Sequence, residues 1–270
     1  MMPPLISEAE FTGSRAKEIA AEYFLALVAQ VEPLIDRING FNVQVDSALE
    51  SDDQDSRTDA VSHQARALLS VAADNVNTLA AVAVKAVILP AFAGYTLLRN
   101  VIECAGVALW LIGPASSDQR VLRALQLSRE SLGDQRRLEA TKAGGKYAGL
   151  APTDSVLRKL EIERDMRPSN TGARLMPPSI TERLEEAEAY VTRHADHQEA
   201  LVVFWQRASG LAHGRRHAVW NVSDARIRRA DHVGFQAVIA ADIVALTAHF
   251  EAAVNYLEDG VRMLEQRGSR

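Results

Sequence analysis

Residues 86–112, AVILPAFAGYTLLRNVIECAGVALWLI, form the most apolar stretch of the chain. The stretch is long enough to cross a bilayer, but Arg99, Asn100 and Glu103 fall near its middle. Charged side chains are most costly to place at the centre of the hydrocarbon layer. We therefore interpret these residues as a central helix of a soluble helical bundle, with a membrane span as the alternative.

The segments on either side have the same helical character. Apolar residues recur at spacings of three and four, and strand signals are nearly absent. The sequence therefore predicts an all-α fold, a bundle of about seven or eight helices. We expect helices over residues 14–37, 60–84, 90–112, 117–142, 153–167, 179–190, 196–212 and 232–266, and one short extended piece over 219–222.

Several residues indicate where these helices bend, begin or end. Pro33 should kink the last turn of the first helix, because proline has no N–H for the helical hydrogen bond. Ser179 followed by Glu182 is a capping box, in which each side chain satisfies a free backbone amide of the other residue. Gly214 is expected to stop the helix that ends near Ala212, because glycine readily adopts a left-handed conformation.

Residues 51–59 suggest a boundary near the N-terminus. They contain four aspartates, Asp52, Asp53, Asp55 and Asp59, against the single Arg57, and no apolar side chain. Such a composition is typical of an exposed acidic loop. We therefore divide the chain into an N-terminal helix with its acidic loop, residues 1–59, and a helical bundle, residues 60–270.

Composition narrows the class of protein. The chain has 270 residues, of which 47% are hydrophobic, enough to bury a core, so disorder is excluded for most of it. Its single cysteine, Cys104, cannot form an internal disulfide, which excludes a secreted disulfide scaffold. The first residues carry no pattern of an export signal. We expect a cytoplasmic protein.

Positive charge is concentrated in one region. Residues 207–229 hold six arginines and a single acid, Asp224, and so carry a formal charge of +5 in a chain whose total is −5. The planar guanidinium fork suits phosphate oxygens, so this region is a candidate phosphate or RNA site. The alternative is a solvated loop that pairs with acidic side chains of a neighbouring helix. The candidate phosphate-binding residues are Arg215, Arg216, His217, Arg226, Arg228 and Arg229.

Within this region, His213 is a candidate for proton transfer. Ser209 and His213 are four residues apart and Arg216 is three further on, so all three would share one face if the helix continued. His213 would lie at a helix C-terminus, where the dipole favours the imidazolium form. An imidazole that exchanges protons beside a fixed guanidinium is suited to phosphodiester cleavage.

The spacing of Arg207 and His213, Arg-x5-His near the end of an all-α chain, resembles the Arg-x4-6-His motif of the HEPN superfamily. The resemblance extends to residues 98–105, LRNVIECA, and to residues 249–253, HFEAA. It implies a HEPN-like core and metal-independent RNA cleavage at a composite site of a homodimer, as in toxins and phage-defence systems. Arg207 and His213 carry over as the motif pair, with Glu103 as a supporting acid.

Two interpretations of Glu103 stay open. Arg99 lies four residues earlier, so the two side chains can simply pair on the helix they share. In the functional interpretation, Glu103 instead meets Arg207 or His213 from a facing helix. Burial of either charge without a partner would be costly, so some partner is required.

Neither a metal nor a cofactor is expected. His194 and His197 are three residues apart, and we interpret them as solvated, because a zinc pair usually has a four-residue spacing and a third ligand. No Walker loop and no Gly-x-Gly-x-x-Gly motif is present. The aromatic residues Trp110, Trp205, Trp220 and Tyr95 are interpreted as core or interface packing.

The sequence leaves two classes of function open. One is a metal-independent endoribonuclease in which His213 is the general acid or base, Arg207 stabilises the phosphate, and Ser209 assists. The other is a non-catalytic sensor or scaffold subunit that binds RNA, a nucleotide or a protein with the same bundle. The partners expected are RNA, a second copy of the chain and an antitoxin or other partner protein, with no membrane.

Overall fold

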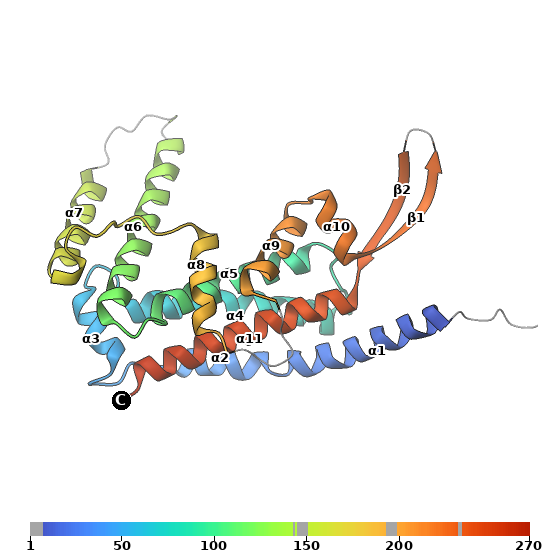
Figure 1. Ribbon diagram of the computed structural model, residues 1–270, viewed down its shortest axis with the longest axis horizontal. Coiled ribbons are helices and arrows are strands. Elements are labelled where there is room, and N and C mark those ends of the chain that lie inside the picture. Colours follow the sequence, from blue (N-terminus) through green and yellow to red (C-terminus); the bar gives the residue numbers. More distant parts are fainter. Residues whose placement is uncertain (1–7, 143, 145–150, 193–198, 232–233) are drawn as a thin grey trace, which may run out of the picture. The chain divides into compact units, whose positions relative to one another are not determined.

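The described part of the chain is mainly helical, and its strands form a single β-hairpin, which confirms the all-α class. The computed structural model describes residues 8–142, 144, 151–192, 199–231 and 234–270, but not the side chains of 8–13, 151–153, 221–231 and 234–237. The elements are α1 (Glu8–Val28), α2 (Val31–Gly40), α3 (Ala48–Asp55), α4 (Val61–Lys85), α5 (Ala93–Ile112), α6 (Ser117–Lys142), α7 (Ala151–Asp165), the 3-10 turn η1 (Pro168–Asn170), α8 (Ile180–Ala187), the 3-10 turn η2 (Glu188–Tyr190), α9 (Leu201–Ala212), α10 (Arg216–Val222), β1 (Ser223–Asp231), β2 (Gly234–Ala241) and α11 (Ile243–Gly268) (Figure 1).

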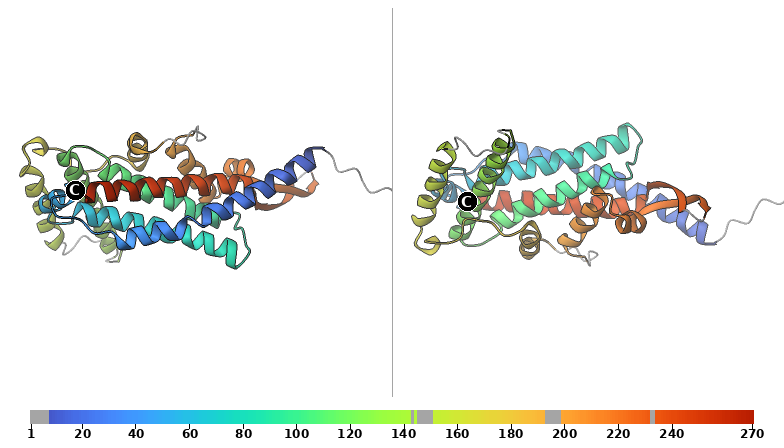
Figure 2. Two further views of the ribbon diagram at one scale, coloured as in Figure 1. Left: turned by 90° about the horizontal axis from the view of Figure 1, so that it is seen from below. Right: turned by 90° about the horizontal axis from the view of Figure 1, so that it is seen from above.

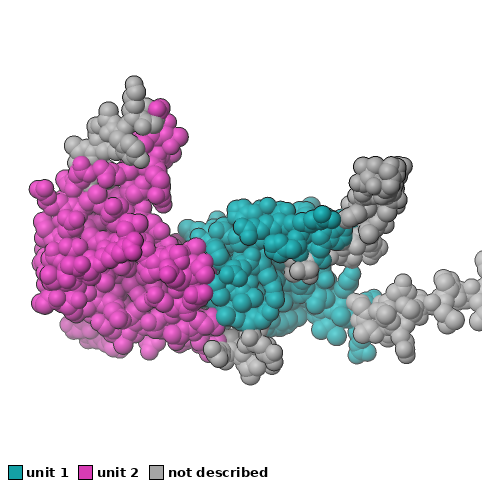
Figure 3. All heavy atoms as spheres, turned by 45° about the horizontal axis from the view of Figure 1, so that its top comes forward, with its two compact units in different colours: residues 1–39, 70–105, 193–258 teal, residues 40–69, 106–192, 259–270 magenta. Residues whose placement is uncertain are grey.

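The described chain groups into two compact units, each assembled from segments that are far apart in the sequence (Figure 3). Unit 1 comprises residues 1–39, 70–105 and 193–258, and unit 2 comprises residues 40–69, 106–192 and 259–270. Helices α4, α5 and α11 contribute residues to both units. The division at residue 59 that the sequence suggested stays a prediction.

Unit 1 is a bundle in which α1 and the unit 1 parts of α4, α5 and α11 run side by side (Figures 1 and 2). The rings of Phe24 and Phe250 pack with centroids 4.6 Å apart, and Thr247 donates a hydrogen bond to the Ala20 carbonyl. Gly94 of α5 lies against side chains of α4 and α11, so a Cβ there would be 3.4 Å from Leu246. These contacts bury an apolar core along the unit.

Unit 2 is held by several ion pairs and by a capped helix. The Arg183 guanidinium of α8 makes two hydrogen bonds of 2.8 and 2.9 Å with Glu130 of α6. The Trp110 indole, buried at the end of α5, donates to Glu186 of α8 at 2.8 Å. The capping box predicted at Ser179 and Glu182 is confirmed and starts α8.

The first predicted helix is two helices. We expected a continuous helix with a kink at Pro33, but α1 ends at Val28 and α2 begins at Val31. The ring of a proline clashes with the carbonyl four residues earlier, which here belongs to Ala29. The chain therefore breaks at 29–30, and Pro33 falls in the first turn of α2, where proline is tolerated.

The exposed acidic loop predicted over 51–59 is wrong for residues 51–55, which belong to α3. Ser47 caps α3 by accepting a hydrogen bond from the Glu50 amide, and α3 continues to Asp55. Asp52 is completely buried, and Asp53 accepts hydrogen bonds from the amide and hydroxyl of Ser62. Asp52 and Asp53 thus have internal partners, whereas Asp55 and Asp59 are exposed.

The segment before the last helix is a β-hairpin. We expected a polar connection over 215–231 with a short extended piece at 219–222, and a final helix from residue 232. The structure instead has α10 over Arg216–Val222, an antiparallel pair of β1 with β2, and a final helix that begins at Ile243. Ser223 pairs with Ala241, and the register shifts between Ile227 and Arg229.

Two helices, α4 and α5, are long and apolar enough to cross a membrane by length and composition alone. A core helix of a soluble protein passes the same test, so this is weak evidence for a span. In the most apolar window of α5, 67% of the residues are buried inside the protein, compared with 33% in α4. Such burial of α5 is typical of a central core helix.

Candidate functional site

The candidate site begins where α9 ends. Gly214 has a φ of 62°, and its amide donates to the Leu211 carbonyl at 2.9 Å. The Arg215 amide donates to the Gly210 carbonyl at 2.8 Å. These two bonds form a Schellman motif, which satisfies the last carbonyls of the helix and reverses the chain. The predicted stop at Gly214 is confirmed.

The reversal separates residues that the sequence placed on one helical face. Ser209, His213 and Arg216 would share a face only if the helix continued, but Arg216 begins α10. Helix α10 packs back on α9, because a Cβ built on Gly210 would lie 2.8 Å from the Cβ of Ala218. Ser209 is half-buried in α9, whereas Arg216 is exposed.

Residues 213–217, which we call the basic turn, connect α9 to α10. His213, Arg215, Arg216 and His217 are all exposed. Among the residues that the structure describes, these four side chains have no hydrogen bond or ion pair. No acidic residue occurs between Glu199 and Asp224 in the sequence. The turn therefore presents two guanidinium groups and two imidazoles to solvent.

Arg207 lies on α9 and, unlike the side chains of the basic turn, has a carboxylate partner. Its guanidinium pairs with both carboxylate oxygens of Glu199, with an Nη2–Oε1 distance of 2.6 Å. Both side chains are partly exposed, at 45% for Arg207 and 40% for Glu199. Six helical residues correspond to a rise of about 9 Å and a rotation that leaves the side chains about 120° apart. Arg207 and His213 are thus not brought together within one subunit by α9.

Glu103 has the simpler of its two predicted roles. Its Oε2 lies 2.9 Å from Nη2 of Arg99, the pair expected on one helix. The same oxygen accepts a hydrogen bond from the Trp205 indole of α9 at 2.8 Å, and the Arg99 guanidinium lies 5.4 Å from the Trp205 ring. Glu103 thus contacts α9 through Trp205, not through Arg207 or His213. No spacing in the sequence predicts the contact between Trp205 and Glu103, which are 102 residues apart.

The remaining arginines of the basic region follow α10 along the chain. Arg226, Arg228 and Arg229 lie on β1, and their side chains are outside the described residues. Arg226 is opposite Val238 and Arg229 is opposite Gln236 in the hairpin. The backbone thus places three further arginine positions on the strand that follows α10.

His249 is a buried imidazole in unit 1 that the sequence did not single out for a role of its own. Its ring lies edge-on to the rings of Tyr95 and Phe204, with centroids 5.1 and 5.2 Å away. Nδ1 donates to the Ala245 carbonyl at 2.8 Å, and Nε2 is buried without a partner. Burial lowers the pKa of His249, an effect that the hydrogen bond to Ala245 opposes and the charge of Arg207 reinforces. The neutral form therefore suits this position.

No group of His, Cys, Asp and Glu in the described part of the chain could hold a metal ion. His194 and His197 lie outside that part. Burial raises the pKa of the Cys104 thiol to about 11, with a smaller contribution from the charge of Glu103. Since the thiolate is the nucleophile, Cys104 is unsuited to nucleophilic chemistry near neutral pH.

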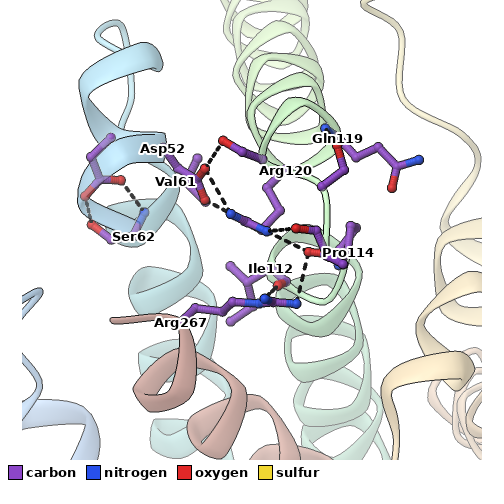
Figure 4. Close-up of polar contacts among 12 residues, drawn as sticks. Asp52, Val61, Ser62, Ile112, Pro114, Gln119, Arg120 and Arg267 are labelled. Atoms are coloured by element: carbon purple, nitrogen blue, oxygen red, sulfur yellow. Dashed lines mark hydrogen bonds and ion pairs between the residues drawn. The ribbon is translucent and has the colours of Figure 1, made fainter. Parts of the chain in front are cut away.

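The most deeply buried charges lie in unit 2 (Figure 4). Asp52 of α3 and Arg120 of α6, whose side chains are 0% and 3% exposed, form an ion pair with an Nε–Oδ2 distance of 2.5 Å. Arg120 also donates to the carbonyls of Pro114 and Ala115, and Ser117 donates to Asp52. Arg267 of α11 donates to the Gly113 carbonyl at 2.9 Å.

These bonds stabilise unit 2 and occupy the charged groups of Asp52 and Arg120. Asp52 accepts from both Arg120 and Ser117, and Nη1 of Arg120 donates to the carbonyls of Pro114 and Ala115, which follow α5. A buried ion pair whose hydrogen bonds are satisfied is a structural element. The exposed, unpartnered groups of the basic turn are therefore the better candidate for binding.

Comparison with known proteins gives no further guidance, because no family model, no curated protein and no solved structure matches this chain.

Proposed function

We propose that this protein binds RNA through the phosphates that contact its basic turn. The observation that carries the proposal is the exposure of His213, Arg215, Arg216 and His217 without partners among the described residues. Two other arginines of unit 1 have carboxylate partners instead: Arg207 pairs with Glu199, and Arg99 pairs with Glu103. A solvated guanidinium without an internal partner binds phosphate without first breaking an ion pair.

The surrounding chain supports the same interpretation. Residues 200–223 contain no acid, so no carboxylate on these elements competes with phosphate. Arg226, Arg228 and Arg229 follow on β1 and extend the cationic stretch beyond α10. A phosphate-dominated interface releases counterions on binding, so its affinity should fall steeply as salt is raised.

Metal-independent RNA cleavage is a second candidate function. The observation that favours it is the exposed imidazole of His213 at the C-terminal end of α9, two residues from Arg215. An imidazole in this position can exchange a proton with a ribose hydroxyl or leaving oxygen while a guanidinium stabilises the phosphate. Ser209 is half-buried one turn earlier and is the less accessible of the two.

The HEPN-like role of Arg207 requires a change of partner. Its bidentate pair with Glu199 occupies the fork that phosphate would use. In the cleavage proposal, phosphate displaces Glu199, or a second copy of the chain brings its own Arg207 to the His213 of the first. The toxin or phage-defence class, the homodimer and the cytoplasmic location belong to this proposal. The Glu199 pair favours the alternative, a non-catalytic RNA sensor or a scaffold for an antitoxin or other partner protein.

Binding is tested by the fluorescence anisotropy of a labelled single-stranded RNA at several salt concentrations. Arg215→Ala and Arg216→Ala should each weaken binding and each reduce the slope of log K against log salt by about 0.7. Arg137→Ala is the matched control, because Arg137 is a similarly exposed arginine on α6 that already pairs with Asp134. Equal losses in all three variants, or no binding by the intact protein, would refute the proposal.

Cleavage is tested on the same RNA in EDTA, with His213→Ala and Arg207→Ala. Loss of cleavage in both variants, with RNA binding retained, supports the nuclease. Binding without cleavage supports the sensor. Cleavage that survives both substitutions removes the assigned catalytic pair.

A further inference from the structure

The connection between α4 and α5 exposes a cluster of apolar side chains. Residues 84–92, which we call the apolar turn, have the sequence VKAVILPAF. Five of its side chains are exposed to solvent by a large fraction. These are Val84 at 44%, Val87 at 85%, Ile88 at 55%, Leu89 at 37% and Phe92 at 40%. Such a dense apolar cluster at the surface marks an interaction site.

The backbone of the turn holds this apolar surface outward at an energetic cost. Val87, the most exposed of the five, has a φ of 55°. A β-branched residue in the left-handed region is a strong outlier, and strain of this kind is associated with function. Pro90 reduces the number of backbone N–H groups that need water, since proline has none.

Along the chain, the charge on both sides of the turn has one sign, although burial and the charge of Asp242, just before α11, raise the pKa of Tyr95 of α5. No acidic residue occurs between Asp74 and Glu103, a stretch that includes both flanking helical segments. Its two cations are Lys85, which is exposed within the turn, and Arg99, which pairs with Glu103. Exposed apolar side chains insert at the boundary of headgroups and acyl chains, and Lys85, which has no partner among the described residues, adds attraction to an anionic bilayer.

The size of the cluster argues against a second protein as its occupant. A stable protein interface uses about 20–30 residues on each side, whereas the apolar turn is a nine-residue helix connection with five exposed apolar side chains. A bilayer surface deforms around a small apolar projection and needs no complementary shape. We infer that the apolar turn inserts into the surface of anionic membranes and so anchors unit 1 peripherally.

This inference does not depend on RNA binding, and it goes beyond the sequence-based expectation of no membrane partner. It describes a shallow contact with the headgroup and acyl boundary, not a membrane span. The basic turn and the apolar turn share no residue, so variants of one leave the other intact.

Insertion is tested with a fluorescent probe at the turn. In a Cys104→Ser background, which removes the single native cysteine, Ile88→Cys and Leu138→Cys are each labelled with an environment-sensitive dye. Leu138 of α6 is the matched control, because its side chain is 54% exposed and that of Ile88 is 55% exposed. With phosphatidylcholine vesicles that contain about 30% phosphatidylglycerol, we expect a blue shift and brighter emission at position 88 but not at 138.

Vesicle flotation of unlabelled protein gives the second measurement. Ile88→Glu should lower the partition coefficient by about tenfold or more. It removes an aliphatic side chain that inserts into the bilayer and adds a negative charge that anionic lipids repel. Lys85→Ala should lower it by about fivefold on anionic vesicles and little on neutral ones. Leu138→Glu should have no effect, and circular dichroism should show the same helical content in all variants.

The inference is overturned if the probe at 88 does not respond, or if both positions respond equally. It is also overturned if sedimentation reveals a dimer that Ile88→Glu dissociates while vesicles bind neither protein, because the occupant would then be a second copy. RNA binding by Ile88→Glu should match that of the intact protein, so failure of this inference is distinguishable from failure of the proposed function.

Discussion

Replacement of Asp52 by asparagine should be among the most damaging single substitutions in unit 2. The carboxylate is fully buried, and its partner Arg120 is 3% exposed, so water cannot replace the lost charge. Removal of one partner of a buried ion pair leaves the other charge uncompensated and typically costs about 3–5 kcal/mol. Asparagine keeps one acceptor oxygen but adds an NH2 group among the donors of Arg120 and Ser117. We therefore expect a loss of about 3 kcal/mol in the free energy of unfolding.

Urea unfolding followed by far-ultraviolet circular dichroism measures this loss. The matched control is Asp134→Asn, the same change in an ion pair with Arg137 whose side chains are 61% and 72% exposed. A surface pair of this kind contributes about 0–1 kcal/mol, so the control should unfold close to the parent midpoint. In thermal unfolding, Asp52→Asn should lower Tm by roughly 6–12 °C, given about 2–4 °C per kcal/mol for a chain of this size.

A second substitution distinguishes a lost ion pair from a merely disturbed helix. Arg120→Met added to Asp52→Asn removes the uncompensated charge and keeps a side chain of similar length. The double variant should recover part of the stability that Asp52→Asn loses. If Asp52→Asn matches its surface control, or if the double variant is simply the sum of two losses, then the ion pair does not stabilise unit 2 as argued.

Three further predictions concern unit 1. Glu199→Gln should release Arg207 and tighten RNA binding by up to about fivefold, because an exposed ion pair contributes at most about 1 kcal/mol. In the presence of Arg207→Ala, the same change should have a smaller effect in the anisotropy assay. Equal effects in the two backgrounds would contradict a competition between Glu199 and RNA phosphate for Arg207. The lowered pKa of His249 means that the unfolded chain binds a proton more readily than the folded one, so the contribution of His249 is fully present above about pH 6.5 and is lost as pH falls toward the folded pKa. His249→Phe should flatten that part of the profile of urea midpoints against pH, and an unchanged profile would assign the dependence to other groups. Gly210→Val should lower the free energy of unfolding by about 1–3 kcal/mol, because even a Cβ at this position would lie 2.8 Å from the Cβ of Ala218. It should also weaken RNA binding by moving α10 away from α9. Normal stability and normal binding would show that the two helices are not packed closely.

Features that depend on neighbouring residues in the sequence could be predicted. The Ser179–Glu182 capping box and the stop at Gly214 are set by local hydrogen bonds and by backbone freedom, which a short stretch of sequence specifies. The effect of Pro33 was predicted from the same kind of information, but as a kink in one helix, whereas the clash with the carbonyl of Ala29 breaks the helix before the proline. Local chemistry therefore predicted the helical class of the chain and these two helix ends.

Features that depend on distant partners could not be predicted. Asp52 was interpreted as exposed because its neighbours are acidic, but its partner Arg120 is 68 residues away. Glu103 and Trp205 are 102 residues apart, and no spacing rule links them. For the candidate site, sequence reasoning found the basic residues at 213–217 but could not foresee that Glu199 holds Arg207.

The β-hairpin was missed for a different reason. The alternation of Ala225, Arg226, Ile227 and Arg228 is a strand signal, but it spans few residues. The apolar run before Asp242, which includes Val238, fits a buried helix as well as a strand. Short apolar runs of this kind are ambiguous by periodicity alone. A stronger weight on the alternation in β1 would have found the hairpin.

The burial of Asp52 has a practical consequence for dissecting the protein by deletion. A fragment that begins at Ala60 retains Arg120 but discards α3 and with it the only carboxylate that pairs with this arginine in the described structure. The Gln44 amide, which donates to the Gly268 carbonyl at 2.9 Å, would be lost as well. Shortened versions cut at the acidic stretch should thus express as unstable or aggregating material, and activity missing from them would say nothing about where RNA binds.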